Sequence, residues 1–187
     1  YFFAGLLSHQ PMGFYPPHVV VSDAQHAGVT FLPIDLRYSN ANVTVEKDAI
    51  RLGINYINGL GLTQIKLIEE ERKQRQFTSL EDLVERTGLN RAQVEALVLS
   101  GALDHLQDQS GERRQMLWDI ADAYNPAQHT SDLLIHRSKK DINLPAMDEA
   151  ERMTNEFAVT GVSLKGHLST LRRTVFKQHS THPIRDL

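Results

Sequence analysis

The chain lacks cysteine altogether, since none of its 187 residues is of that type. This absence excludes disulfides, thiolate metal sites and cysteine nucleophiles, and it suits a reducing compartment. No apolar run approaches the length of a membrane span, and no basic-then-apolar leader marks a signal peptide. We therefore expect a cytoplasmic protein without a membrane partner. The first residues, from Tyr1, are typical of the middle of a helix, so we also expect a piece of a longer protein.

A large excess of either charge is also missing. The 20 lysines and arginines face 23 aspartates and glutamates, which gives a formal net charge of −3. The chain is therefore not a general polycation, and any binding of nucleic acid has to depend on local patches. With 41% hydrophobic and 23% charged residues, the composition is that of a folded globular protein.

The most informative motif present is the turn Gly59-Leu60-Gly61, between an arm that begins at Leu52 and a helix that begins near Thr63. We expect both glycines to turn through backbone angles that other residues avoid, with their amides facing outward and Leu60 tucked between helices. The helix would direct its free N–H groups and its positive dipole end at the same point. A helix-hairpin-helix motif holds the phosphate backbone of duplex DNA in this way. The expected DNA contacts here are Gly59, Leu60, Gly61, Leu62, Thr63 and Lys66.

This turn departs from the commonest form of the motif. Ile65 stands where many such motifs have a small residue, and Leu62 and Thr63 stand where a cation often follows the glycines. An ordinary tight turn between two packed helices is therefore an alternative interpretation.

A second helical pair follows the first. Ser79 and Asp82 are typical of a helix start, Gly88 of its end, and Asn90 with Gln93 of the next start. Two such pairs in tandem would bury a shared four-helix core. The second turn lacks the Gly-x-Gly form. A DNA contact through Gly88, Asn90 and Arg91 and a purely structural connection are therefore equally open.

Basic residues gather in two places. The first group is Lys66, Arg72, Lys73 and Arg75, and the second is Lys165, Arg172, Arg173 and Lys177. Of these, Lys66 is nearest the first turn and is the one that we expect to contact DNA. The others could equally form a solvated helix face, because Glu69, Glu70 and Glu71 partly neutralise the first group.

These residues resemble the distal fingers and tandem helix-hairpin-helix region of bacterial C-family DNA polymerases, that is, the polymerase III alpha subunits and their error-prone relatives. The resemblance is carried by Gly28-Val29, Leu32-Pro33-Ile34-Asp35, Arg51-Leu52-Gly53, Gly59-Leu60-Gly61, Phe77-x-Ser79-Leu80-Glu81-Asp82-Leu83 and Leu97-x-x-Ser100-Gly101-Ala102-Leu103-Asp104. The opening Gln10-Pro11-Met12-Gly13-Phe14-Tyr15 fits the same family. The run Arg113-Arg114-Gln115-x-x-Trp118 and a short linker favour the error-prone branch.

The resemblance and the patterns together predict a mainly α fold with a small β element (α+β), built on a tandem helix-hairpin-helix module. We expect four parts. They are a distal-fingers-like segment with a small β-hairpin (1–52), the tandem helix-hairpin-helix DNA-binding module (53–106), a helix and polar linker (107–146), and a helical segment (147–187) leading to an oligonucleotide-binding barrel beyond the chain.

No catalytic or metal-binding residue is expected within this chain. Polymerases of this kind hold two metal ions on clustered aspartates, whereas the aspartates here are scattered over helix caps and turns. His179 and His182 form a close pair without a third ligand of suitable spacing. The resemblance places the catalytic carboxylates and their Mg²⁺ upstream of Tyr1, so the chain alone should be inactive.

A possible peptide for a sliding clamp lies in the polar linker. In the replicative relatives a short peptide after the hairpin module docks into the clamp, and here Gln128, Leu133 and Leu134 occupy a comparable place. The spacing departs from the usual clamp peptide, so a linker that folds its leucines back onto the helices is the favoured alternative.

The sequence thus predicts a non-catalytic, duplex-DNA-binding region of an error-prone DNA-directed DNA polymerase, a nucleotidyltransferase of replication and translesion repair synthesis. Three alternatives stay open: the same region of a replicative alpha subunit, a free-standing DNA-binding module, and an interaction scaffold whose hairpins only pack helices.

Overall fold

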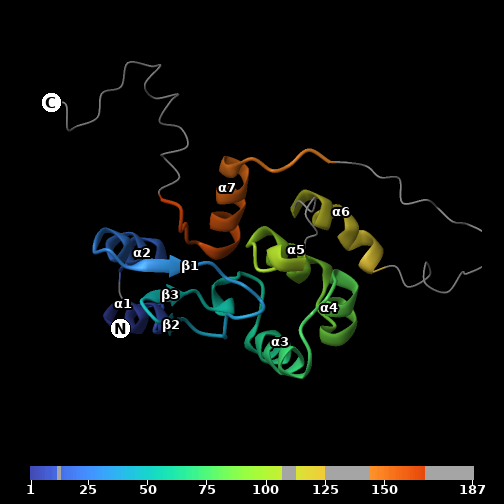
Figure 1. Cartoon of the computed structure of the whole chain (residues 1–187), viewed down its shortest axis with the longest axis horizontal. Helices are drawn as coiled ribbons and strands as arrows, with labels where there is room; N and C mark the ends of the chain where they lie inside the picture. Colours follow the sequence, from blue (N-terminus) through green and yellow to red (C-terminus); the bar gives the residue numbers. More distant parts are fainter. Residues whose placement is uncertain (12–13, 107–112, 125–143, 167–187) are drawn as a thin grey trace, which may run out of the picture.

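The computed structural model describes residues 1–11, 14–106, 113–124 and 144–166 (Figure 1). Within these ranges the chain forms seven α-helices and one three-stranded sheet, which confirms the expected mainly α fold with a small β element. No helix in the described ranges is long and apolar enough to cross a membrane.

The N-terminal part packs two helices beside the sheet. The helices are α1 (Phe2–Ser8) and α2 (Pro17–His26), and α2 begins at Pro17 because a fixed φ suits the first helical position. The strands are β1 (Thr30–Leu32), β2 (Thr44–Glu46) and β3 (Ala49–Arg51), in the order β1-β3-β2. The antiparallel hairpin of β2 and β3 was expected. The parallel pairing of β1 with β3 is a further finding.

The hairpin module follows directly from β3. It consists of the short 3-10 turn η1 (Ile54–Tyr56), α3 (Leu62–Gln74), α4 (Leu80–Thr87) and α5 (Arg91–Leu99). The expected caps are confirmed. The Ser79 hydroxyl accepts a hydrogen bond from the Asp82 N–H, and Gly88 ends α4 with a φ of 59°. Local hydrogen bonding therefore fixes where these helices begin and end.

Two more helices cover the module. They are α6 (Arg113–Ala123), which follows the turn η2 (Asp104–Leu106), and α7 (Glu149–Thr160). In Figure 1, α7 lies against α5 and near α2. Ion pairs join α6 to α7, with Arg113 at 2.8 Å from Glu156. The carbonyl of Val159 in α7 accepts a hydrogen bond of 2.8 Å from the N–H of Asn58, just before the first hairpin turn.

A single apolar core runs through the sheet and the helices. Fully buried side chains come from nearly every element; they include Leu7, Val21, Leu36, Ile54, Ile65, Ile68, Leu83, Leu97 and Ile120. Burial of apolar surface contributes about 25 cal/mol per Å², so this shared core provides most of the stability of the fold.

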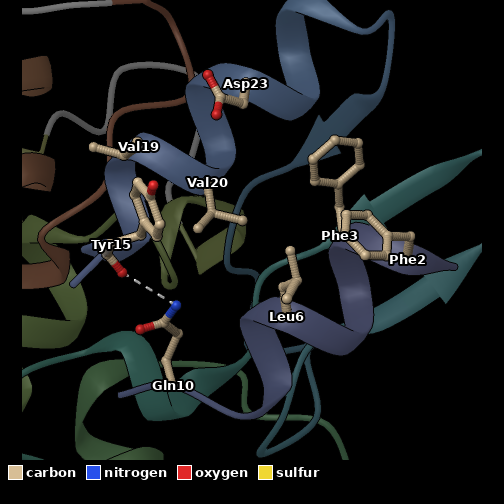
Figure 2. Close-up of a pocket in the computed structure, with 8 residues that line it drawn as sticks. All are labelled: Phe2, Phe3, Leu6, Gln10, Tyr15, Val19, Val20 and Asp23. Atoms are coloured by element: carbon tan, nitrogen blue, oxygen red, sulfur yellow. Dashed lines mark hydrogen bonds between the residues drawn. The ribbon is translucent and has the colours of Figure 1, made fainter. Parts of the chain in front are cut away.

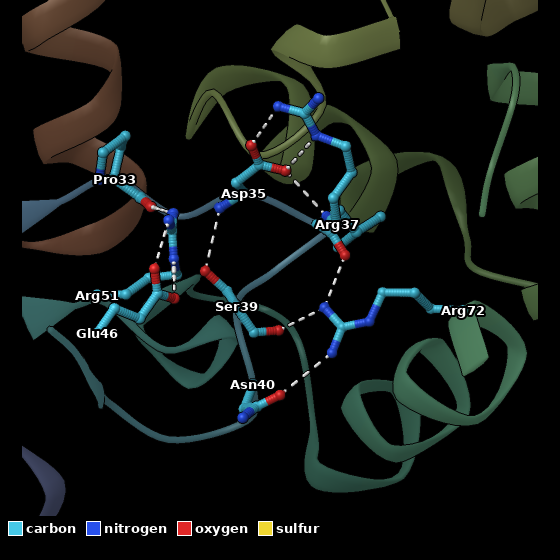
Figure 3. A network of polar contacts seen from close by, with 9 residues as sticks. Pro33, Asp35, Arg37, Ser39, Asn40, Glu46, Arg51 and Arg72 are labelled. Atoms are coloured by element: carbon cyan, nitrogen blue, oxygen red, sulfur yellow. Dashed lines mark hydrogen bonds and ion pairs between the residues drawn. The ribbon is translucent and has the colours of Figure 1, made fainter.

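A polar network fastens the loop between β1 and β2 onto α3 (Figure 3). The guanidinium of Arg72 donates to the carbonyl oxygens of Leu36 (2.7 Å) and Ser39 (2.6 Å), and to Asn40 Oδ1 (3.2 Å). Glu69, one turn earlier on α3, accepts from the Ala41 N–H at 2.6 Å. Arg72 therefore holds the fold together and does not belong to a free basic face.

The carboxyl of Asp35 lies in the same loop. Burial raises its pKa, but hydrogen bonds from Arg37 and the charge of that residue outweigh the burial and leave the pKa below its ordinary value. The resulting stabilisation is present above the pKa of the unfolded chain and is lost as the pH falls through the lower, folded pKa.

Two neighbouring cations of α3 provide a test of the structural role assigned to Arg72. Arg72→Met should lower the free energy of unfolding by about 2 to 4 kcal/mol, because the carbonyls of Leu36 and Ser39 lose their donor. Lys73→Met, at the next and exposed position, should change it by no more than about 0.5 kcal/mol. Urea unfolding followed by circular dichroism measures both, and equal stabilities for the two variants would contradict the structural role of Arg72.

Candidate nucleic-acid interface

The first hairpin turn reverses the chain between η1 and α3. Gly59 has a φ of +89°, a region that residues with side chains rarely adopt, and nothing lies within 4 Å of where its Cβ would be. Leu60 is partly buried against the core, as expected. The turn at Gly59 therefore depends on backbone conformation and not on lack of space.

The expectation that Gly61 adopts backbone angles that other residues avoid is wrong. Gly61 has φ −84° and ψ 165°, ordinary extended angles, because it is the N-cap residue of α3. Its carbonyl accepts the first helical hydrogen bond, from the Ile65 N–H at 3.0 Å. A Cβ at this position would meet only the mobile Oε1 of Gln64, at 2.8 Å. One glycine, not two, makes the turn.

The arm before the turn is also shorter than a helix-hairpin-helix pattern implies. It contains one 3-10 turn, Ile54–Tyr56, and Ile57 returns to extended angles. Before this 3-10 turn, Gly53 packs so closely against the backbone of Ala41 and Asn42 that a Cβ would lie 2.5 Å from the Ala41 carbonyl oxygen. The hairpin module therefore contains three α-helices and one short 3-10 turn, where four helices were expected.

The N-terminus of α3 carries the features of an anion site. No side chain caps it, and Leu62 and Thr63 in its first turn are exposed, Leu62 to 71%. The first N–H groups of an α-helix have no partner within the helix, and the dipole adds partial positive charge there. Lys66 is exposed one turn further along. The arrangement can bind a phosphate through backbone amides and one cation.

The second turn is built differently. The expected capping box of α5 is present, since Asn90 Oδ1 accepts from the Gln93 N–H and Gln93 Oε1 accepts from the Asn90 N–H, both at 3.0 Å. One first-turn amide of α5 is thereby already paired. Gly88, Asn90 and Arg91 are all exposed, but the guanidinium of Arg91 lies 2.7 Å from Glu95. This turn offers less free positive charge than the first.

The two turns are joined by the side chain of Gln93. Its Nε2 donates to the carbonyl oxygen of Gly59 at 3.3 Å, across 34 residues of sequence. Sequence reasoning identified Gln93 as a capping residue only. No signal in the sequence indicated that its amide group also reaches the first turn.

The two arginines of the first basic group, Arg72 and Arg75, are engaged within the fold. Arg75 lies 2.6 Å from Asp82, where Arg86 also approaches. Burial raises the pKa of Asp82, but the Thr78 N–H and the two arginines lower it below its ordinary value. Arg72 belongs to the loop network. Among the described residues, Lys66 and Lys73 are therefore the members of this group that are exposed and form no ion pair.

The second basic patch lies mostly outside the described residues. Lys165 is described and lies 3.5 Å from Glu149, whereas Arg172, Arg173 and Lys177 fall outside. The clamp-peptide candidates Gln128, Leu133 and Leu134 and the pair His179 and His182 also fall outside.

Several of the described carboxylates pair with arginines. Asp35 pairs with Arg37, and Asp104 lies 2.7 Å from Arg113. Within the described ranges no group of three or more His, Cys, Asp and Glu residues could hold a metal ion.

A cavity of about 280 Å³ lies between α1 and α2 (Figure 2). Its lining is mostly apolar and comprises Phe2, Phe3, Leu6, Gln10, Tyr15, Val19, Val20 and Asp23. The Gln10 side chain donates to the Tyr15 carbonyl at 3.4 Å. Because the described residues of the lining include one carboxylate and no cation, they are not suited to a phosphate.

Comparison with known proteins agrees with this geometry. Residues 28–116, which contain both turns, match the family model described as a helix-hairpin-helix motif. The chain is 38% identical over 173 residues to the error-prone DNA polymerase of Corynebacterium diphtheriae, covering 92% of this chain and 16% of that protein.

Other curated error-prone DNA polymerases give similar values. The polymerase of Corynebacterium glutamicum is 39% identical, covering 87% of this chain and 15% of that protein. The polymerase of Bordetella parapertussis is 33% identical, covering 92% of this chain and 16% of that protein. The chain therefore spans about one sixth of the length of these relatives. The resemblance seen in the sequence is confirmed: the chain is a homologue of one segment of the error-prone DNA polymerases, and its residues 28–116 carry the helix-hairpin-helix match.

Proposed function

We propose that this chain is the region of an error-prone DNA-directed DNA polymerase that grips the backbone of duplex DNA near the primer–template. The observation that carries the proposal is the uncapped N-terminus of α3 directly behind the positive-φ turn at Gly59. Backbone amides and Lys66 would contact phosphates there, and Leu62 and Thr63 would flank them. The second turn, through Gly88, Asn90 and Arg91, would supply a weaker contact.

The chemistry of such a contact is independent of base sequence. Phosphates are the same at every step of a duplex, and backbone amides with one lysine would contact phosphates without reading base edges. A polymerase needs this property, because it has to hold each new duplex that it makes.

Nucleotidyl transfer would take place outside this chain. Polymerases use carboxylate-bound metal ions to align the primer hydroxyl and the incoming triphosphate, and Mg²⁺ would be held by residues of the longer protein. The role of this chain would be to hold the product duplex during replication and translesion repair synthesis in the bacterial cytoplasm. A contact with the sliding clamp would be made by the linker, through Gln128, Leu133 and Leu134.

Binding of duplex DNA is the first prediction. The chain should bind labelled duplexes of unrelated sequence with the same weak affinity, and the affinity should fall with salt with a logarithmic slope of about −1 to −3, because few phosphates are contacted. Fluorescence anisotropy at several salt concentrations measures this. Strong preference for one sequence, or affinity that does not change with salt, would contradict the proposal.

The turn at Gly59 can be tested against Gly28, another glycine with a positive φ, with the same added side chain. Gly59→Val should weaken duplex binding about tenfold, because a β-branched residue at φ +89° costs roughly 1 to 3 kcal/mol and the turn has to rearrange.

Gly28→Val is the matched control. Gly28 has a φ of +84° with nothing within 4 Å of its Cβ position, and it lies between α2 and β1, outside both hairpin turns, so the folded variant should bind within about threefold of the parent. Circular dichroism checks that both variants fold. If folded Gly59→Val binds like the parent, the hairpin is an ordinary turn and does not bind phosphate.

Catalysis gives a further test. Supplied with primer–template, Mg²⁺ and four deoxynucleoside triphosphates, the purified chain should extend no primer, because the proposed active site lies elsewhere in the longer protein. Denaturing gel electrophoresis detects extension, and a full-length error-prone polymerase serves as the positive control. Templated extension by the chain alone would place the active site within it.

A further inference from the structure

We propose that Gln93 is a positioning residue that fixes the two hairpin turns as one phosphate-binding unit. The inference rests on the proposed function and deepens it, because it names what sets the geometry of the site. Its basis is the pair of hydrogen bonds made by one side-chain amide: Oε1 accepts from the Asn90 N–H at 3.0 Å, and Nε2 donates to the Gly59 carbonyl at 3.3 Å.

The two partners demand a group with both hydrogen-bonding roles. The Asn90 N–H can only donate and the Gly59 carbonyl can only accept. A primary amide supplies an acceptor and a donor at its two ends. A glutamate in the same place could satisfy Asn90 but would turn an oxygen towards the Gly59 carbonyl. The environment therefore distinguishes glutamine from its nearest isosteres.

The bond to Gly59 controls the amides that follow it. A trans peptide is planar and directs its carbonyl and its N–H in opposite directions. The Leu60 N–H donates to the Ile57 carbonyl at 3.4 Å, and the bond from Gln93 to the Gly59 carbonyl restrains the other side of the same plane. That plane leads into Gly61 and the first turn of α3. Gly59 itself has no side chain to restrict its φ and ψ, so an external contact restricts the turn more than it would at another residue.

The bond to Asn90 controls the other turn. Asn90 caps α5 through its own side chain, and Gln93 completes the capping box. The same amide group thus stands at the start of α5 and at the first turn. Two weak phosphate contacts held at a fixed separation bind more tightly than two that move independently, because the second contact becomes intramolecular.

Three variants separate this role from helix capping and from charge. Gln93→Glu keeps the acceptor for the Asn90 N–H and removes the donor to Gly59. Gln93→Met removes both without adding charge. Gln76→Glu, at an exposed position between α3 and α4, adds the same negative charge away from both turns. Duplex binding by the parent and the three variants is measured by anisotropy over a range of salt, with thermal unfolding as the check on folding.

Loss of the bridge should affect Gln93→Glu and Gln93→Met alike. Both should bind about three- to tenfold more weakly than the parent, with a salt slope smaller by about one, because the contact at the second turn is no longer held in place. Gln76→Glu should stay within about twofold. A purely structural defect would lower the unfolding temperature without changing the salt slope of the folded protein.

The backbone amide resonance of Leu60 gives a second readout that needs no DNA. It should shift in both Gln93 variants and stay unchanged in Gln76→Glu, since it reports on the hydrogen bond at the Gly59 carbonyl. An unchanged Leu60 resonance, or parental binding by both Gln93 variants, would overturn the positioning role while leaving the proposed function intact. Weaker DNA binding by Gln93→Met alone would assign the effect to helix capping and would also overturn the positioning role. If the parent itself binds no duplex, the proposed function fails, and this inference fails with it.

Discussion

The hold of α3 on the loop between β1 and β2 is the constraint on which the hairpin depends. Arg72 donates hydrogen bonds to the carbonyl oxygens of Leu36 and Ser39. Glu69, one turn earlier on α3, accepts a hydrogen bond from the N–H of Ala41. Buried backbone groups without partners cost about 1 to 3 kcal/mol each, so the loop stays where these side chains can reach it. The loop in turn lies against Gly53, where a Cβ would meet the carbonyl oxygen of Ala41 at 2.5 Å. The entry of the chain into the first turn is therefore set by contacts made further along α3.

This arrangement divides the charges of α3 between two roles. Arg72 is used within the fold and Arg75 pairs with Asp82, while Lys66 and Lys73 stay exposed. A chain with a net charge of −3 and two exposed cations on this helix has little electrostatic attraction for DNA. The proposed binding would then depend chiefly on backbone amides at the helix N-terminus, which are insensitive to base sequence and act only on an anion in direct contact with them. Weak, sequence-independent binding would suit the proposed role, in which this region acts beside other DNA contacts of a longer protein.

Features set within about four residues could be predicted from the sequence. The cap at Ser79, the left-handed end at Gly88, the capping box of Asn90 and the hairpin of β2 with β3 all depend on neighbours in the chain, and each is confirmed. The angles of Gly61 were predicted wrongly, because the rule for Gly-x-Gly turns does not say which glycine makes the turn and which caps the helix.

The remaining features arise from contacts that no local pattern encodes. The bonds from Arg72 to the loop span 33 and 36 residues, and the bond from Gln93 to Gly59 spans 34. In the sequence Arg72 is one of several cations on a helix and Gln93 is one cap residue, and the same letters would occur in a helix that made neither contact. The parallel pairing of β1 with β3 likewise joins residues distant in the sequence, such as Thr30 and Ala49. Tertiary hydrogen bonds of this kind are decided by geometry after the helices are placed.

The first turn is held on both sides by bonds that leave its outer amides available. Upstream, the Asn58 N–H donates to Val159 of α7, and at the turn the Gly59 carbonyl accepts from Gln93. Neither bond uses the amides of Leu62 or Thr63, and no side chain caps the helix that they begin. A rigid turn with free donors loses little conformational entropy when an anion binds, which is the general basis of preorganised recognition. Because α7 returns from the far side of the linker to supply one of these bonds, the geometry of the hairpin depends on segments on both sides of it in the sequence, and a shorter piece containing the motif alone would lack the contact that fixes Asn58.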